Sequence, residues 1–188
     1  KVDNDGMTCV DEDADLHSVI PDELWLRILG YLGIVDICRV GGTSRRYNIL
    51  CKDPTLWKDL IFDWANVKRS LKSISKVLDR AIKVEKLRFT NKSYDISPDE
   101  KTMTSVIERV KDSLKVLILD TEIVPRNSAV AKFGCLSKLE VLDFPSDKLA
   151  TSGVNAIAKL KNLRELRIPG CEVVTPKDLS HLFQELKN

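Results

Sequence analysis

One pattern of hydrophobic and polar positions recurs along the chain: apolar, two variable positions, apolar, one variable position, apolar. Four strong copies read VEKLRF at 84–89, LKVLIL at 114–119, LEVLDF at 139–144 and LRELRI at 163–168, and a weaker copy, WKDLIF, occupies 57–62. Their central leucines are 27, 30, 25 and 24 residues apart. The alternation predicts a short strand with one face in a core, repeated five times along the chain.

Helical patterns lie between these strands and after the last one. Apolar residues recur at spacings of three and four in four stretches: Val67, Leu71, Ile74, Leu78 and Ala81; Met103, Val106, Ile107 and Val110; Val154, Ile157, Ala158 and Leu160; Leu179, Leu182, Phe183 and Leu186. Three of them follow helix-breaking pairs, Ser97-Pro98, Ser152-Gly153 and Thr175-Pro176, whereas Pro125 predicts an irregular connection after the LKVLIL strand. One strand and one helix cannot bury their apolar faces alone, so the units must stack.

The stacked units resemble the leucine-rich-repeat family, and Gly170-Cys171 with the following Val174-Thr175 and Leu179 is similar to its cysteine-containing subclass. The resemblance implies a solenoid of about five short strand–helix repeats, with an α/β character. The alternative is a doubly wound α/β sheet, which requires longer buried strands and a ligand-binding loop. The sequence shows neither, so we expect the solenoid.

Residues 20–60 follow a different pattern. The segment Ile20-Pro21-Asp22-Glu23 predicts the start of a helix, with Ser18 as the capping residue and the two acids at the positive end of the helix dipole. Apolar residues then lie nearly all round this helix: Leu24, Trp25, Leu26, Ile28, Leu29, Tyr31 and Leu32. So small a module cannot bury every face of such a helix, so we expect another protein to cover part of it. The alternative is that the repeat domain covers it.

The order of motifs over about 40 residues resembles the F-box. The segment opens with Ile20-Pro21-Asp22-Glu23-Leu24, continues through Asp36-Ile37-Cys38-Arg39-Val40 and Arg45-Arg46-Tyr47, and closes with Asp53-Pro54-Thr55-Leu56-Trp57. It departs from the family pattern at Ile20, Thr43-Ser44 and Tyr47, and above all at Gly41-Gly42. Two glycines inside a helix cost about 2 kcal/mol, so we expect a break between a second and a third helix there.

The F-box resemblance implies a partner and a role. F-box modules bind the small Skp adaptor, which links them to a cullin-type ubiquitin ligase, and the domain that follows selects a protein substrate. The expected adaptor-binding residues are Ile20, Pro21, Leu24, Ile28, Leu32, Ile37, Val40 and Tyr47. The alternative is an interaction scaffold, for example in organelle complex assembly, that kept the leucine-rich repeats and lost or repurposed the F-box.

The variable positions of the five strands form the predicted concave binding face. They are Asp59, Ile61, Asp63, Lys86, Arg88, Thr90, Val116, Ile118, Asp120, Val141, Asp143, Pro145, Glu165, Arg167 and Pro169. Within this face the expected substrate-binding residues are Arg88, Val116, Ile118, Val141, Asp143 and Arg167, because an apolar centre with a charged rim suits a protein partner. A basic stripe, Lys68, Lys72, Lys76 and Arg80, is interpreted as a solvated helix face rather than an anion or nucleic-acid site.

Composition and charge complete the expected organisation. Residues 1–15 carry six acids against one lysine, which predicts a disordered acidic tail over 1–17, followed by the F-box module over 18–57 and the repeats over 58–188. The remaining residues have 29 basic and 22 acidic side chains, too small an excess for a dedicated nucleic-acid binder. The chain begins at Lys1 rather than Met, which is typical of a fragment.

Candidate chemistry is sparse. No apolar run reaches the length of a membrane span, and five cysteines at irregular spacing predict neither a disulfide framework nor a metal site. The sequence lacks a glycine-rich phosphate loop, an HExxH motif and a GxSxG motif. We therefore expect a non-catalytic protein without cofactors, located in the cytoplasm, the nucleus or both.

Overall fold

The computed structural model describes residues 20–64, 77–81, 83–91 and 100–171. The chain divides into two compact units, one ending at Asp53 and the other beginning at Pro54. Among the predicted features, the acidic tail, Ser18, the stripe Lys68–Lys76 and the final apolar stretch lie outside the described residues. The predicted domain boundaries at 17/18 and 57/58 stay predictions, and each unit is described by itself.

Over its described residues, 20–53, the first unit contains three short helices, α2 (Asp22–Leu29), α3 (Ile34–Val40) and α4 (Arg45–Leu50). The extended backbone of Pro21 precedes α2, so proline occupies the capping position that the sequence suggested for Ser18. The α4 helix begins after Ser44, whose hydroxyl accepts a 3.2 Å hydrogen bond from the Tyr47 amide. The expected break at Gly41-Gly42 is confirmed, because these residues form the turn between α3 and α4.

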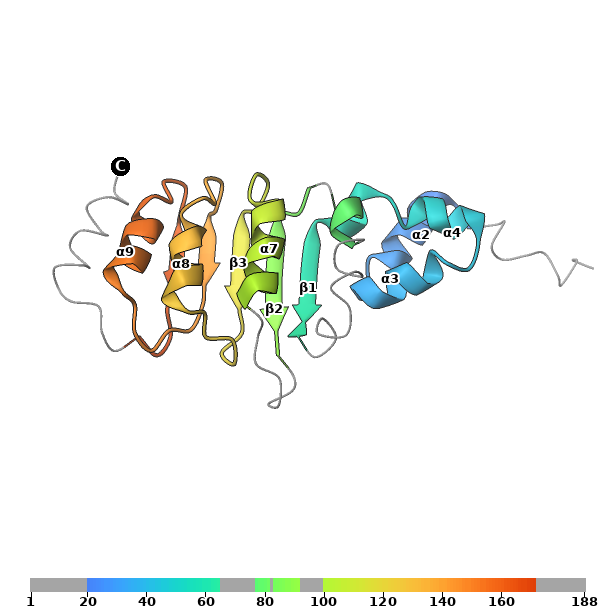
Figure 1. Cartoon of the computed structure of the whole chain (residues 1–188). Helices are drawn as coiled ribbons and strands as arrows, with labels where there is room; N and C mark the ends of the chain where they lie inside the picture. The colour runs from blue at the N-terminus through green and yellow to red at the C-terminus, as the bar shows by residue number, and fades with distance from the viewer. Residues whose placement is uncertain (1–19, 65–76, 82, 92–99, 172–188) are drawn as a thin grey trace, which may run out of the picture. The chain divides into compact units, whose positions relative to one another are not determined.

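The second unit begins with a 3₁₀ turn, η1 (Pro54–Trp57), and contains one parallel sheet of five strands in the order β1-β2-β3-β4-β5. Figure 1 shows each strand beside its neighbour in sequence. The strands are β1 (Asp59–Asp63), β2 (Lys86–Thr90), β3 (Val116–Leu119), β4 (Val141–Asp143) and β5 (Glu165–Arg167). All five lie where the repeated pattern predicts them.

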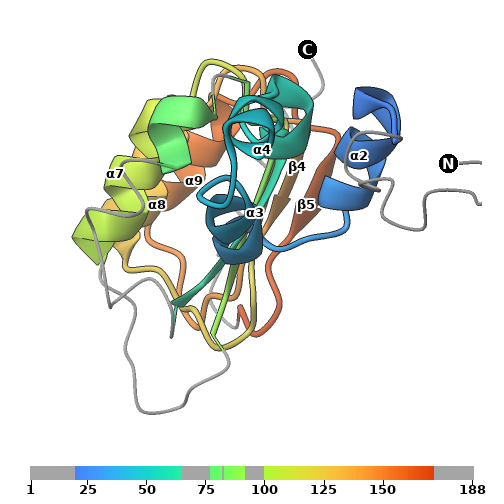
Figure 2. The ribbon, with the colours of Figure 1, turned by 90° about the vertical axis from the view of Figure 1, so that its right-hand side faces the viewer.

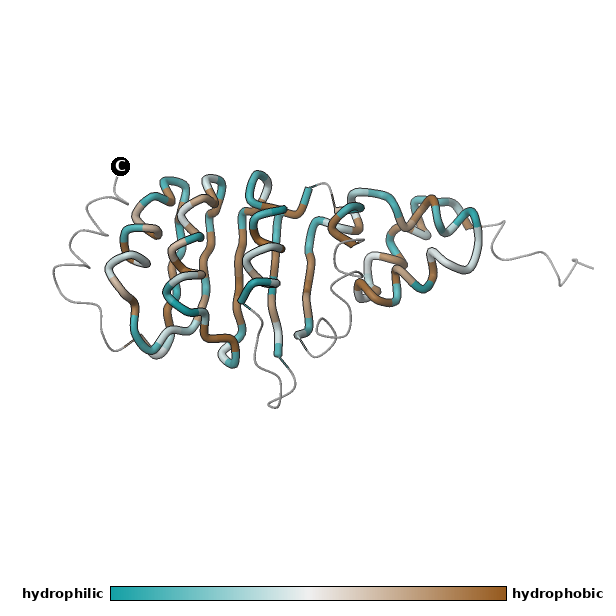
Figure 3. Tube along the Cα trace, viewed as in Figure 1, coloured by the Kyte–Doolittle hydropathy of each residue, from teal (hydrophilic) through white to brown (hydrophobic). Residues whose placement is uncertain are grey.

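The register of the sheet aligns the central leucines of the five copies. Leu60 pairs with Leu87, which pairs with Leu117, and the row continues through Leu142 to Leu166. The first four leucines of this row are fully buried, whereas Leu166 on the last strand is half-buried. Figure 3 shows β1 and β3 as hydrophobic stretches along the chain. The leucine spacing of the sequence thus becomes one continuous row inside the core.

Three described helices cover one face of this sheet: α7 (Glu100–Val110), α8 (Asn127–Phe133) and α9 (Thr151–Ala158). Figure 2 shows all three on the same side of the strands. The apolar residues predicted to face the core from α7, among them Met103 and Ile107, are buried, and so is Ile157 of α9. Phe133 of α8 packs edge-on against Phe144, with ring centroids 5.7 Å apart.

One local expectation was only partly confirmed, and another was wrong. The connection after β3 is irregular from Asp120 to Arg126, as predicted, but it then continues into the helix α8, which was not predicted. Pro125 lies just ahead of α8, where its fixed φ does not interrupt the helical hydrogen bonds. The α9 helix begins at Thr151, so Ser152-Gly153 lies inside its first turn rather than before it. A side chain at Gly153 would require its neighbours to shift, because its Cβ would lie 2.7 Å from Leu149 Cδ1 and 3.1 Å from Val130 Cγ1.

Charged residues alternate in sign along the edge of the sheet where the strands begin. The residues just before strands β1 to β5 are Lys58, Glu85, Lys115, Glu140 and Arg164. From Glu85 onward, each backbone amide donates to the carbonyl of the preceding member, with distances of 2.7–2.8 Å. Ion pairs join Lys115 to Glu85 at 3.2 Å and Arg164 to Glu140 at 3.9 Å. We call these five residues the charge ladder.

Candidate protein-binding surfaces

The helical unit exposes an unusual share of large apolar side chains. Eight such side chains are exposed among the described residues, and six of them belong to residues 24–49: Leu24, Ile28, Tyr31, Leu32, Val35 and Ile49. Leu24 and Ile28 are 46% and 45% exposed and lie one turn apart on α2, so they share a face. Exposed apolar groups at this density are typical of a protein-binding surface.

The predicted adaptor-binding residues divide into two groups. Pro21, Leu24, Ile28 and Leu32 are exposed, and Ile20 and Val40 are half-buried. Ile37 and Tyr47 are buried, with 3% and 8% of their surface exposed. In this conformation the two buried residues offer little area to a partner, and Tyr47 packs against Trp25 of the exposed helix. Their assignment to the binding surface stays a prediction.

The α4 helix fixes the start of α2. The Arg46 guanidinium donates from Nη2 to the carbonyl oxygen of Ile20 at 2.7 Å, and from Nε and Nη2 to Asp22 Oδ1 at 3.0 and 2.6 Å. One turn inward, the rings of Trp25 and Tyr47 meet edge-on with centroids 5.0 Å apart. These contacts hold the helix that presents Leu24 in a defined position.

The Gly41-Gly42 turn has a packing role besides ending α3. A Cβ on Gly41 would lie 3.1 Å from Cys51 Cβ, closer than most side-chain contacts, and Cys51 is fully buried. The Gly41 carbonyl also accepts a 3.0 Å hydrogen bond from the Asn48 side chain. The glycine therefore lets the end of α3 approach the end of α4, a reason that the sequence pattern alone did not reveal.

The sheet face opposite α7, α8 and α9 carries the variable positions of the strands, and we call it the open face. Arg88 and Arg167 are exposed, whereas Val116, Ile118, Val141 and Asp143 are half-buried. The register places Val116 beside Val141, and Ile118 between Arg88 and Asp143. The six residues predicted to bind a substrate thus come together on β2 to β5. Pro145 is an exception to the wider prediction, since it is buried.

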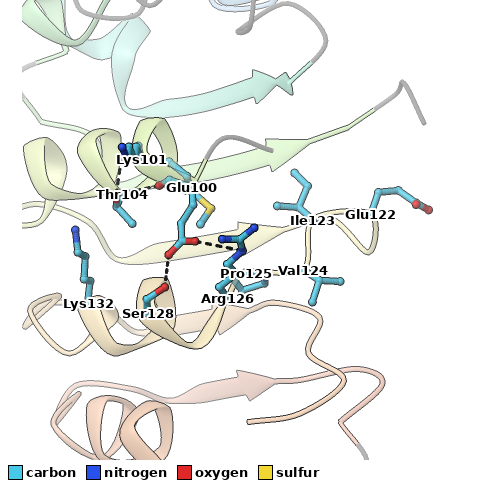
Figure 4. Close-up of a pocket in the computed structure, with 11 residues that line it drawn as sticks. Glu100, Lys101, Thr104, Glu122, Ile123, Val124, Pro125, Arg126, Ser128 and Lys132 are labelled. Carbon is cyan, nitrogen blue, oxygen red and sulfur yellow. Dashed lines mark hydrogen bonds and ion pairs between the residues drawn. The ribbon is translucent and has the colours of Figure 1, made fainter. Parts of the chain in front are cut away.

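A pocket of about 660 Å³ lies between the first turns of α7 and α8 and the loop that joins β3 to α8. Figure 4 shows the Glu100 carboxylate accepting a hydrogen bond from Ser128 and forming an ion pair with Arg126 at 3.8 Å. Met103, Ile123 and Pro125 supply apolar lining. Its described lining residues include no histidine or cysteine. They therefore provide neither a Ser–His nor a Cys–His pair.

Over residues 20–64, 77–81, 83–91 and 100–171, no three His, Cys, Asp or Glu side chains form a group that could hold a metal ion. No helix in the described part of the chain combines the length and the apolar character that crossing a membrane requires.

Comparison with known proteins places the helical region in a defined class of module. Residues 17–63 match the model of the F-box-like family, a span that includes α2, α3, α4 and β1. A segment of 62 residues is 36% identical to F-box only protein 4 of Bos taurus. This alignment covers 31% of the chain and 16% of the length of that relative. The chain therefore carries an F-box-like domain at residues 17–63, whose last five residues form β1, the first strand of the five-stranded parallel sheet.

Proposed function

We propose that this chain is a non-catalytic, substrate-recruiting subunit of a Skp–cullin–F-box type ubiquitin ligase. The F-box-like domain binds a Skp-type adaptor and, through it, a cullin. The strand–helix unit is a short leucine-rich-repeat solenoid whose open face binds a protein substrate. Such a subunit acts in the cytoplasm, the nucleus or both.

The observation that carries the proposal is the apolar surface of the F-box-like domain. Leu24 and Ile28 project from a helix that Arg46 and the Trp25–Tyr47 contact fix from the inner side. Large apolar side chains on a positioned helix are the residues from which protein interfaces derive most of their affinity. The aligned leucine row supports the proposed leucine-rich-repeat solenoid, because the central leucine of each repeat takes the same position in the sheet.

The test measures binding of the purified chain to a Skp-type adaptor by isothermal titration calorimetry and gel filtration. We expect a stable complex, and we expect Leu24→Asp or Ile28→Asp to weaken it at least tenfold, since burying an unpaired carboxylate costs more than about 1.4 kcal/mol. Val124→Asp is the matched control, because Val124 is 49% exposed but belongs to the other unit, and it should leave the affinity unchanged.

Two outcomes would count against this proposal. A chain that forms no complex would favour the alternative, an interaction scaffold whose F-box has been lost or repurposed. A complex that Leu24→Asp, Ile28→Asp and Val124→Asp weaken equally would mean that α2 does not provide the binding surface.

A further inference from the structure

The net charge of the open face is opposite in sign to that of the residues after position 15. It holds five carboxylates, on Asp59, Asp63, Asp120, Asp143 and Glu165, and three cations, on Lys86, Arg88 and Arg167, which gives a net charge of −2. The residues after position 15, by contrast, have an excess of seven positive charges. Because charge complementarity selects partners, this local reversal favours a cationic partner on the open face.

The ion pairs within the open face reinforce this preference. Lys86 Nζ lies 3.2 Å from Asp59 Oδ2. Arg88 donates a 2.9 Å hydrogen bond from Nε to Oδ1 of Asp120, and its Nη2 forms an ion pair with the same oxygen at 2.8 Å.

On β5, Arg167 forms ion pairs with two carboxylates, those of Asp143, at 3.7 Å, and Glu165. All three cations of the open face therefore already have carboxylate partners. An incoming acid must compete with these pairs, whereas an incoming Lys or Arg meets carboxylates that can accept further hydrogen bonds.

An apolar patch lies between the charged groups. Val116 and Val141 are direct neighbours across β3 and β4, and Ile118 lies two positions along β3 on the same face. Arg88 on β2 and Arg167 on β5 flank the patch, roughly 14 Å apart at the usual strand spacing. Parallel sheets normally have both faces covered, so these half-buried side chains are suited to contact with a partner.

We infer that the open face binds a protein segment in which aliphatic or aromatic residues are flanked by Lys or Arg. The apolar residues of the segment cover Val116, Ile118 and Val141, and its cations approach Asp143 and Glu165. This inference rests on the proposed function, because it specifies the class of substrate for the same face. An acidic segment, such as residues 1–15 of this chain, has the wrong sign for it.

The test is a phage-display selection from a random library of twelve-residue peptides, with the intact 188-residue chain as bait. We expect the enriched peptides to combine an apolar core with a net positive charge, and to bind at least tenfold more weakly to the Ile118→Asp variant by fluorescence anisotropy. No enrichment, or enrichment of acidic or uncharged peptides, would overturn the inference.

Neutralising variants test the charge requirement without changing the apolar patch. Asp143→Asn with Glu165→Gln should weaken the best peptide about three- to thirtyfold and flatten its salt dependence, as expected for the loss of two partly exposed ion pairs. The matched control, Asp79→Asn with Glu108→Gln, removes the same total charge from residues paired with Arg109 and Lys132 and should change nothing. Equal effects of the two double variants would overturn the inference.

These outcomes separate the inference from the proposed function. Acidic peptides that still require Ile118 would leave the open face as a binding site and refute only the substrate class. Basic, apolar peptides that bind Ile118→Asp undiminished would refute both the inference and the substrate-binding part of the proposed function. Adaptor binding, measured separately, does not depend on either result.

Discussion

The two compact units differ in how many of their large apolar side chains they bury. The strand–helix unit places one leucine per strand in a continuous row inside its core, and only Ile61 and Val124 remain among its exposed large apolar side chains in the described residues. The three short F-box-like helices form only a small core, and six large apolar side chains of their described residues stay exposed. A small unit has a high surface-to-volume ratio and cannot bury all of its large apolar side chains, whereas the larger unit buries most of those that the structure describes.

The largest effect expected from this comparison is on folding. Leu117 is fully buried in the leucine row, and its neighbour Ile118 points to the open face. Leu117→Ala should lower the free energy of unfolding by about 2–5 kcal/mol, and Ile118→Ala by less than about 1 kcal/mol, because only the first creates a cavity. Urea denaturation followed by circular dichroism measures both. Equal losses would mean that the two faces of β3 are equally buried in solution.

A smaller effect is expected where the F-box-like domain positions its exposed helix. Arg46→Ala removes the bonds to Asp22 and the Ile20 carbonyl, and should destabilise the start of α2 by about 1 kcal/mol. Amide exchange over residues 22–29 should accelerate, and adaptor affinity should fall several-fold. Arg39→Ala is the control, since Arg39 pairs only with Asp36 within α3 in the described contacts. Unchanged exchange in Arg46→Ala would exclude this positioning role.

The smallest effect concerns the charge ladder, which adds a polar component to the apolar burial of the second unit. A double-mutant cycle on Glu85→Gln and Lys115→Met should give a coupling free energy of about 0.2–1 kcal/mol, because both side chains are more than 40% exposed. The coupling should decrease in 1 M salt. A coupling of zero in low salt would show that the Glu85–Lys115 pair does not contribute to the stability of the sheet.

The strands were predictable because a two-residue alternation repeated five times leaves one register in which the central leucines face the same side of the sheet. The α8 helix was missed because seven residues carry too little periodicity, and because Pro125 precedes the helix instead of interrupting it. The break at Gly41-Gly42 followed from helix propensity.

The candidate binding surfaces could be predicted only in part from the sequence. Exposure of Leu24 and Ile28 follows from a helix that is apolar on several faces, but the burial of Ile37 and Tyr47 depends on how three short helices pack. The contact of Arg46 with Asp22 joins residues 24 positions apart, and local patterns contain no information on such pairs. Tyr31, Val35 and Ile49 are exposed for the same three-dimensional reason and were not predicted as binding residues.

The sequential strand order has a mechanical consequence. Each strand of the sheet is hydrogen-bonded to the strands that precede and follow it in the chain, so the sheet has no pairing between its first and last strands. Force applied along the stack therefore loads one strand pair at a time. In an optical trap the sheet should lengthen in successive steps, each the length of one strand with its connecting segment, beginning at an end of the sheet. A protein of this design can lose its last strand while the preceding strands remain folded.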